Sequence, residues 1–118
     1  MKTILVVDDD VIFRTIAKRC LNQLGFKVLE LESGKEVIRQ VRSCAIEAII
    51  LDIIMDEQEG IETIRQLMDL SERPKIVAVS SNVFYLEMAM GFGVDSVLTK
   101  PIACKHLEEV LNKLDITA

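Results

Sequence analysis

The chain has 118 residues, half of them hydrophobic, and a formal net charge of −5 at pH 7. A chain of this length is one domain of ordinary size and can bury a core without disulfides or metal ions to stabilise it. The acidic charge argues against nucleic-acid binding by this chain, because phosphate contacts need a basic face.

Membrane spanning and export are also disfavoured. No apolar stretch is long enough to cross a bilayer, and Asp8, Asp9 and Asp10 come too early to lie within a signal-peptide core. The three cysteines, Cys20, Cys44 and Cys104, are odd in number and have no C-x-x-C spacing. We therefore expect small buried thiols in a reducing compartment, and a cytoplasmic protein.

Strand-like and helix-like patterns alternate five times along the chain. Apolar runs predict strands over residues 3–7, 26–31, 46–51, 75–79 and 94–99. Apolar residues at helical spacing predict helices from Phe13 through Ile16 to Leu24 and from Leu107 to Leu114. A capping box from Ser33 to Glu36 predicts the start of another helix. Two more helices are predicted, one that begins after Gly60 and one over the apolar segment 83–90. This alternation predicts an α/β fold with a doubly wound parallel sheet.

Polar residues follow four of the predicted strands. They are Asp8 and Asp9, Asp52, Ser80 and Ser81, and Lys100, which Pro101 follows directly. In a parallel sheet the carboxyl ends of the strands form the ligand crevice, so these side chains should converge. Crowded carboxylates repel one another unless a cation joins them, and Mg²⁺ suits such an oxygen site. The set predicts a metal-assisted phosphoryl site.

Each of these residues also has a simpler structural interpretation when it is taken alone. Asp10 is suited to cap a helix, Asp52 could cap a loop, and Lys100 could be a surface charge. The joint pattern favours the site. His106 is the single histidine, so neither a zinc site nor a Ser-His-Asp triad is credible, and we expect it on the surface.

Four segments carry a resemblance to a known family. Val6-Val7-Asp8-Asp9-Asp10, Leu51-Asp52-Ile53-Ile54-Met55, Val79-Ser80-Ser81 and Thr99-Lys100-Pro101 resemble the receiver domains of bacterial two-component response regulators, and the chain is similar to the chemotaxis receivers. The resemblance covers residues 1–118 as a single receiver domain. It implies a flavodoxin-like fold with five helices and a five-stranded sheet in the order 2-1-3-4-5.

The resemblance also implies a role for each matching residue. Asp52 would accept a phosphoryl group from a histidine kinase or phosphotransfer protein, and Lys100 and Ser80 would contact the phosphoryl oxygens. Mg²⁺ would be bound by Asp9, Asp52 and the backbone carbonyl of Ile54, and by Asp8 through water. The Lys100–Pro101 bond resembles the family's cis peptide. Met55 is expected to pack rather than to bind metal.

The sequence departs from the family pattern in four places. Ser80 replaces the usual Thr, Asp56 replaces a Pro, Val97 replaces an aromatic residue, and the segment from Ser81 to Gly93 is about two residues short. Since the family's aromatic ring rotates when the switch is set, Val97 predicts an altered readout. Phe84 or Tyr85 could replace the ring, although core or interface packing is the simpler interpretation.

The predicted fourth helix is apolar around its circumference, with one charge in residues 83–90. Some of its large side chains should therefore be exposed, as partner surfaces are, unless the short loop places the helix deeper. In the family, the fourth helix, fifth strand and fifth helix form dimers and bind output partners, so a homodimer through this face is expected.

Three functions fit these observations. The first is a phosphorylatable signalling switch that is not a turnover enzyme, although it catalyses its own phosphorylation and dephosphorylation. The second is a phosphate-independent interaction module on the receiver fold, which Val97 and the apolar helix favour. The third, an aspartyl-phosphate phosphohydrolase, is disfavoured because Asp52-Ile53-Ile54-Met55 lacks a second acid and 118 residues leave no room for a cap domain.

Overall fold

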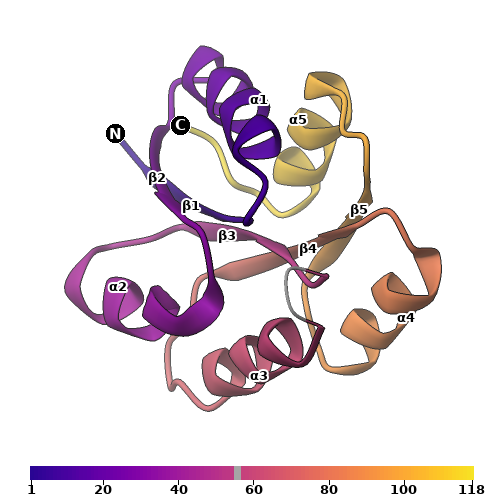
Figure 1. Cartoon of the computed structure of the whole chain (residues 1–118). Helices are drawn as coiled ribbons and strands as arrows, with labels where there is room; N and C mark the ends of the chain where they lie inside the picture. The colour runs from indigo at the N-terminus through magenta and orange to yellow at the C-terminus, as the bar shows by residue number, and fades with distance from the viewer. Residues whose placement is uncertain (55–56) are drawn as a thin grey trace.

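The computed structural model describes residues 1–54 and 57–118, without the side chains of residues 57–59. Five strands form one sheet: β1 (Thr3–Val7), β2 (Lys27–Leu31), β3 (Ala48–Asp52), β4 (Lys75–Ser80) and β5 (Ser96–Thr99). All neighbouring strands are parallel, in the order β2-β1-β3-β4-β5. The structure confirms the predicted doubly wound sheet (Figure 1).

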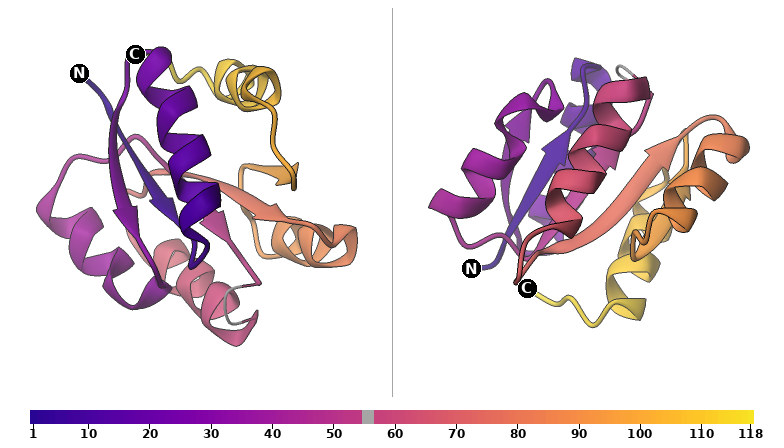
Figure 2. Two further views of the ribbon diagram at one scale, coloured as in Figure 1. Left: turned by 45° about the horizontal axis from the view of Figure 1, so that its top comes forward. Right: turned by 90° about the horizontal axis from the view of Figure 1, so that it is seen from below.

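Helices cover both faces of the sheet. They are α1 (Val11–Gln23), α2 (Val37–Ser43), α3 (Glu57–Met68), α4 (Val83–Gly91) and α5 (Cys104–Lys113), with a short 3-10 turn, η1 (Gly34–Glu36), before α2. Helices α1 and α5 lie side by side on one face, and α3 lies between α2 and α4 on the other (Figures 1 and 2). None of the helices in the described residues is long and apolar enough to cross a membrane.

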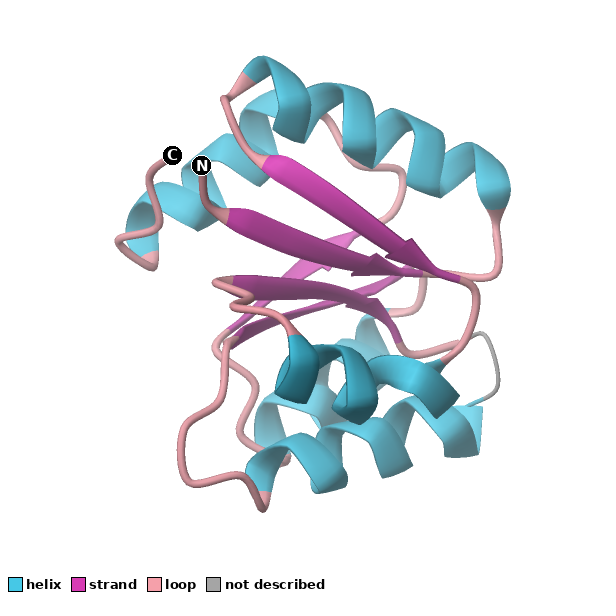
Figure 3. Cartoon of the chain, turned by 90° about the vertical axis from the view of Figure 1, so that its left-hand side faces the viewer, coloured by secondary structure: helices cyan, strands magenta, loops and turns pink. Residues whose placement is uncertain are grey.

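The core has two halves because successive strand residues point to opposite faces. Ile4 and Val6 of β1 pack in the half that α1 and α5 cover, whereas Leu5 and Val7 pack in the half beneath α2, α3 and α4. Every residue of β3 is buried, as expected for a central strand covered on both sides. The layers are visible edge-on in Figure 3. This packing fixes the register of the strand ends that carry the polar residues.

Helix α1 starts as predicted, but the exposure of Ile16 and the start of the next helix differ from the sequence prediction. Asp10 caps α1 as expected, because its Oδ1 accepts a hydrogen bond from the N–H of Ile12 at 2.9 Å. Ile16, however, is 44% exposed, since it lies at the border of the apolar face of α1 rather than inside it. The predicted capping box is incomplete: Ser33 Oγ accepts from the N–H of Lys35 at 3.4 Å, and the first turn is 3-10.

Gly60 lies inside α3 instead of preceding it, so that prediction was wrong. A Cβ at this position would lie 2.8 Å from Ile53 Cα and 2.9 Å from the Ile53 carbonyl oxygen. The glycine therefore lets the backbone of α3 pack directly on the loop that follows Asp52.

The fifth strand begins at Ser96, two residues later than predicted. Gly93, with φ +101°, ends α4 in the left-handed region. The N–H of Val94 then donates to the Ala89 carbonyl, and the N–H of Asp95 donates to Ile76 at 2.9 Å. These bonds hold residues 94 and 95 in the turn after α4.

The expectation of three small buried thiols was wrong. Cys20 is buried, but Cys104 is exposed and forms a disulfide with it, and Cys44 is an exposed free cysteine. The pair is separated by 84 residues in sequence and meets because α1 and α5 lie together on one face of the sheet. Cysteine spacing alone could not reveal that proximity.

Candidate functional site

Three carboxylates meet at the carboxyl edge of the sheet. Asp8 and Asp9 follow β1, and Asp52 ends β3, the strand that pairs with β1. Each offers one oxygen, and these oxygens lie within 4.8 Å of one another. Asp8 and Asp52 are 0% and 4% exposed, whereas Asp9 is exposed. An oxygen cluster of this kind can bind a metal ion, and we find it where the sequence predicted it.

Hydrogen bonds hold the backbone of Asp8 and one oxygen of its carboxylate. Its Oδ1 accepts a hydrogen bond from the N–H of Asp10 at 2.8 Å, and its own N–H donates to the Leu31 carbonyl at 3.0 Å. Its carbonyl accepts from Nη1 of Arg14 at 2.6 Å. These bonds fix the turn between β1 and α1, so the carboxylate has a defined direction.

Lys100 completes the acidic cluster from the end of β5. Its Nζ lies 2.8 Å from Asp8 Oδ2 and 3.2 Å from Asp52 Oδ2, and its N–H donates to the Ser80 carbonyl at 2.9 Å. The ammonium group also lies 4.6 Å from the centre of the Phe13 ring. The Lys100–Pro101 peptide bond is cis, as the sequence resemblance implied.

Burial and charge oppose each other at this site. Burial raises the pKa of Asp8 to about 6, and the charge of Asp52 adds to the increase, against the lowering effects of Lys100 and the N–H of Asp10. Burial alone would lower the pKa of Lys100, but the two carboxylates outweigh burial and hold it above its usual value. The lysine therefore stays charged and partly neutralises the acidic pair.

Ser80 lies at the end of β4, fully buried. Its Oγ accepts a hydrogen bond from the N–H of Asn82 at 2.9 Å. Asn82 in turn caps α4, because its Oδ1 accepts from the N–H of Phe84 at 2.9 Å. Asn82 was not among the residues predicted from the sequence, although an Asn directly before an apolar helical segment is a known capping signal.

The residues expected to form the switch differ in exposure. Val97 and Tyr85 are partly buried and pack against the same half of the core. Phe84 is 63% exposed and contacts Tyr85 edge-on, with ring centres 5.8 Å apart. Exposure of some large side chains on α4 is therefore confirmed, and Val83 and Met90 are exposed beside Phe84.

Other predicted residues have less defined roles. The N–H of Ile54 donates to Asp52 Oδ1 at 2.9 Å, which places its backbone next to the acidic cluster. Met55 and Asp56 lie outside the described residues, so the expectations for them stay predictions. His106 is exposed on α5, as expected.

A shallow apolar hollow of about 270 Å³ adjoins Lys100. Helix α1 contributes Ile12, Phe13 and Ile16, and the loop after β5 contributes Ile102. Ile12 is 67% exposed. The site therefore has an apolar, accessible flank next to its charged centre.

A family model and individual related proteins both point to the same family. A model of the response regulator receiver domain matches residues 4–112. The chemotaxis protein CheY of Thermotoga maritima is 27% identical over 117 residues, which cover 96% of this chain and 97% of that protein. Response regulator MprA of Mycolicibacterium vanbaalenii is 33% identical over 113 residues, covering 94% of this chain but 48% of that protein. The chain thus spans nearly all of one relative and about half of the other.

The fold is shared with solved receiver structures. The receiver domain of a sensor histidine kinase from Pseudomonas aeruginosa PAO1, with magnesium coordinated in its active-site cleft, superimposes with a TM-score of 0.85. It is 22% identical, and the match covers 95% of each chain. At this identity the likeness shows the fold alone.

Proposed function

The chain belongs to the response regulator receiver domain family, and we propose that Asp52 accepts a phosphoryl group from a histidine kinase or phosphotransfer protein. Receiver domains are signalling switches rather than turnover enzymes. The observation that carries the proposal is the joining of three carboxylates and one lysine at the edge of the sheet, with Lys100 paired to both Asp8 and Asp52.

The donor set fits Mg²⁺. Asp8, Asp9 and Asp52 supply oxygen ligands within 4.8 Å of one another, and hard divalent cations prefer such ligands. We propose Asp9, Asp52 and the Ile54 carbonyl as direct ligands and Asp8 as a ligand through water. A bound Mg²⁺ would neutralise charge on the phosphoryl oxygens. A protein of the same fold, the receiver domain of the Pseudomonas aeruginosa sensor kinase, has magnesium coordinated in its active-site cleft, and we propose that this chain binds Mg²⁺ in the corresponding place.

The chemistry that we propose is a direct transfer to Asp52. A carboxylate oxygen attacks the phosphorus, the new P–O bond forms as the donor's P–N bond breaks, and the donor nitrogen leaves with the bonding electrons. Lys100 moves from the Asp52 carboxylate to the phosphoryl oxygens, and Ser80 donates its hydroxyl hydrogen to them. Both are charge-stabilising and positioning roles that phosphoryl transfer requires.

We propose that the phosphodonor protein and the output partner bind to two different surfaces. The apolar hollow next to Lys100 gives the phosphodonor protein a face close to Asp52. The exposed face of α4, with Phe84 and Met90, is proposed together with β5 and α5 as the output and homodimer surface. We place this single receiver domain in the cytoplasm, where histidine kinases present their phosphoryl groups.

Intact-mass measurement with a small phosphodonor tests the proposal. Wild type incubated with acetyl phosphate and Mg²⁺ should gain one phosphoryl group. Asp52→Asn, which keeps the size of the side chain, should gain none, and a chelator should stop labelling of wild type. Labelling that persists in Asp52→Asn would refute the assignment of the phosphoacceptor.

Val97 favours a second candidate, a phosphate-independent interaction module. Without an aromatic ring at this position, phosphorylation has fewer contacts through which to shift the structure. Amide shifts of α4 that remain unchanged when Asp52 is fully phosphorylated would favour this alternative.

A further inference from the structure

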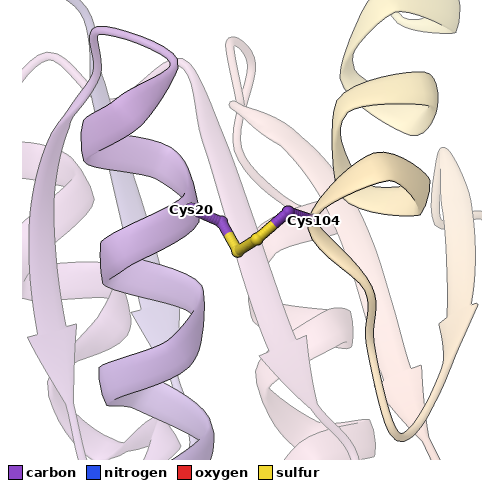
Figure 4. Close-up of a disulfide and its surroundings, with 2 residues drawn as sticks. All are labelled: Cys20 and Cys104. Carbon is purple, nitrogen blue, oxygen red and sulfur yellow. A yellow bond between two sulfur atoms is a disulfide. The ribbon is translucent and has the colours of Figure 1, made fainter.

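The proposed phosphoryl transfer does not use the disulfide between Cys20 and Cys104. Cys20 is in the third turn of α1, and Cys104 is the first residue of α5 (Figure 4). Their Cα atoms are 5.4 Å apart, within the range that a disulfide spans. The two residues are therefore close enough to bond without a large backbone movement.

The two cysteine residues differ in exposure. Cys20 is 2% exposed and packs in the core beneath α1, whereas Cys104 is exposed. A reagent in solution can therefore reach Cys104 first, and Cys20 is placed to react second. The first turn of a helix also favours a thiolate, the form that attacks disulfides.

The disulfide is connected to the phosphorylation site through two elements. Lys100 and Cys104 lie at opposite ends of one short loop, and Phe13 and Cys20 lie on the same helix. Lys100 contacts the Phe13 ring at 4.6 Å, so α1 and the β5–α5 loop touch at two points. When the disulfide is closed, the loop that carries Lys100 is fastened to α1 at its far end.

We propose that Cys20 and Cys104 form a redox-active dithiol pair, which reacts with low-molecular-weight disulfides and whose closure slows the response of Asp52. The coupling to Asp52 depends on the proposed function, whereas the pair itself does not. Slowing is expected because Lys100 must leave Asp52 Oδ2, now 3.2 Å away, and a fastened loop hinders that movement.

The reaction consists of two balanced thiol–disulfide exchanges. The thiolate of Cys104 attacks one sulfur of oxidised glutathione, so that a mixed disulfide forms and one glutathione leaves as thiolate. The thiolate of Cys20 then attacks Cys104 Sγ in the mixed disulfide, and the second glutathione leaves. In total the protein loses two protons and two electrons, and one glutathione disulfide takes them up and becomes two thiols.

Mass spectrometry tests the pair directly. We would use Cys44→Ser as the background, because Cys44 is exposed and free and would add its own adduct. After reduction, oxidised glutathione should remove two hydrogens without leaving an adduct. Cys20→Ala, which keeps the core apolar, should retain one glutathione on Cys104. A disulfide that never forms, or one that reducing agents cannot open in the native protein, would overturn the redox-active pair.

The coupling is tested on the same background in its oxidised and reduced forms. Acetyl phosphate should label Asp52 at least about fivefold more slowly in the oxidised form, a typical size for coupling between two sites. The amide shifts of Phe13, Lys100 and Ile102 should differ between the two forms. In Cys104→Ser, neither oxidation nor reduction should change the labelling rate or these amide shifts. Equal rates with unchanged amide shifts would overturn the coupling. If neither form is labelled, the phosphoacceptor proposal fails, while mass and amide shifts still decide on the dithiol pair.

Discussion

Lys100 is shared by two carboxylates, and its hydrogen bond to Asp52 is the longer of the two contacts: Nζ lies 3.2 Å from Asp52 Oδ2 and 2.8 Å from Asp8 Oδ2. In the proposed mechanism Asp8 anchors the lysine, which exchanges Asp52 for a phosphoryl oxygen. Lys100→Ala should therefore slow the labelling of Asp52 by acetyl phosphate by about a hundredfold, the scale for loss of one charge-stabilising donor.

Metal binding should respond differently to the same substitution. Removing the ammonium group removes a competing cation, so Mg²⁺ should bind to Lys100→Ala as tightly as to wild type or more tightly. Amide shifts during a Mg²⁺ titration measure this. Lys105→Ala, an exposed lysine of α5, is the matched control and should leave both rate and affinity unchanged. A parallel loss of rate and Mg²⁺ affinity would contradict the assigned role of Lys100.

Gly60 controls how closely α3 approaches the loop after Asp52. Since a Cβ would lie within 3 Å of the Ile53 backbone, Gly60→Ala must shift either the helix or that loop. We expect it to lower the free energy of unfolding by about 1–3 kcal/mol, as overpacking does. Because Ile53 adjoins Asp52, Mg²⁺ affinity should fall as well.

A second glycine provides the control for helix propensity. A Cβ on Gly91 in α4 would meet no atom within 4 Å, so Gly91→Ala should raise the free energy of unfolding by about 0.5–1 kcal/mol. Urea denaturation measures both variants. If Gly60→Ala is as stabilising as Gly91→Ala, the close approach to Ile53 is not a constraint.

The sequence was sufficient where one local pattern determined one structural feature. The strand ends with Asp8, Asp52 and Lys100 were predicted because strand alternation and parallel pairing bring them to one edge. Features that depend on how distant elements approach were missed or misjudged. Gly60 has a meaning only through its contact with Ile53, and Cys20 meets a partner 84 residues away.

A partly buried ion pair at the opposite end of the sheet, between Arg73 and Asp95, should give a specific pH dependence. Arg73 Nη1 lies 2.7 Å from Asp95 Oδ2, which also accepts from the N–H of Ile76 at 2.8 Å. Burial alone would raise the pKa of Asp95, but these two hydrogen bonds outweigh it and hold the pKa below its usual value. The folded state therefore favours the ionised carboxylate.

The sign of the pH effect follows from that lowered pKa. The stabilisation is complete above the pKa of the unfolded state, about 3.9, and is lost as pH falls through the lower pKa of the folded state. Asp95→Asn should lower the free energy of unfolding at pH 7 by about 1–3 kcal/mol and flatten its decline below pH 4. Urea titrations at several pH values measure this, with exposed Asp69→Asn as control. An unchanged acid slope in Asp95→Asn would exclude this ion pair as its source.

Val97 packs with Tyr85 against the core half beneath α4, which leaves the switch without the family's rotating ring. Phosphorylation can then act on α4 through two hydrogen bonds of 2.9 Å each. The N–H of Asn82 donates to Ser80 Oγ, and the N–H of Phe84, in the first turn of α4, donates to Asn82 Oδ1. Beryllofluoride, a mimic of the phosphoryl group, should therefore cause modest amide shifts in α4 of wild type. In Val97→Tyr the shifts should be equal or larger, because a ring adds contacts that differ between the two states. Asn82→Ala, which removes the capping bond to Phe84, should reduce the response in both backgrounds. A full response in wild type that survives Asn82→Ala would show that the signal reaches α4 by another route.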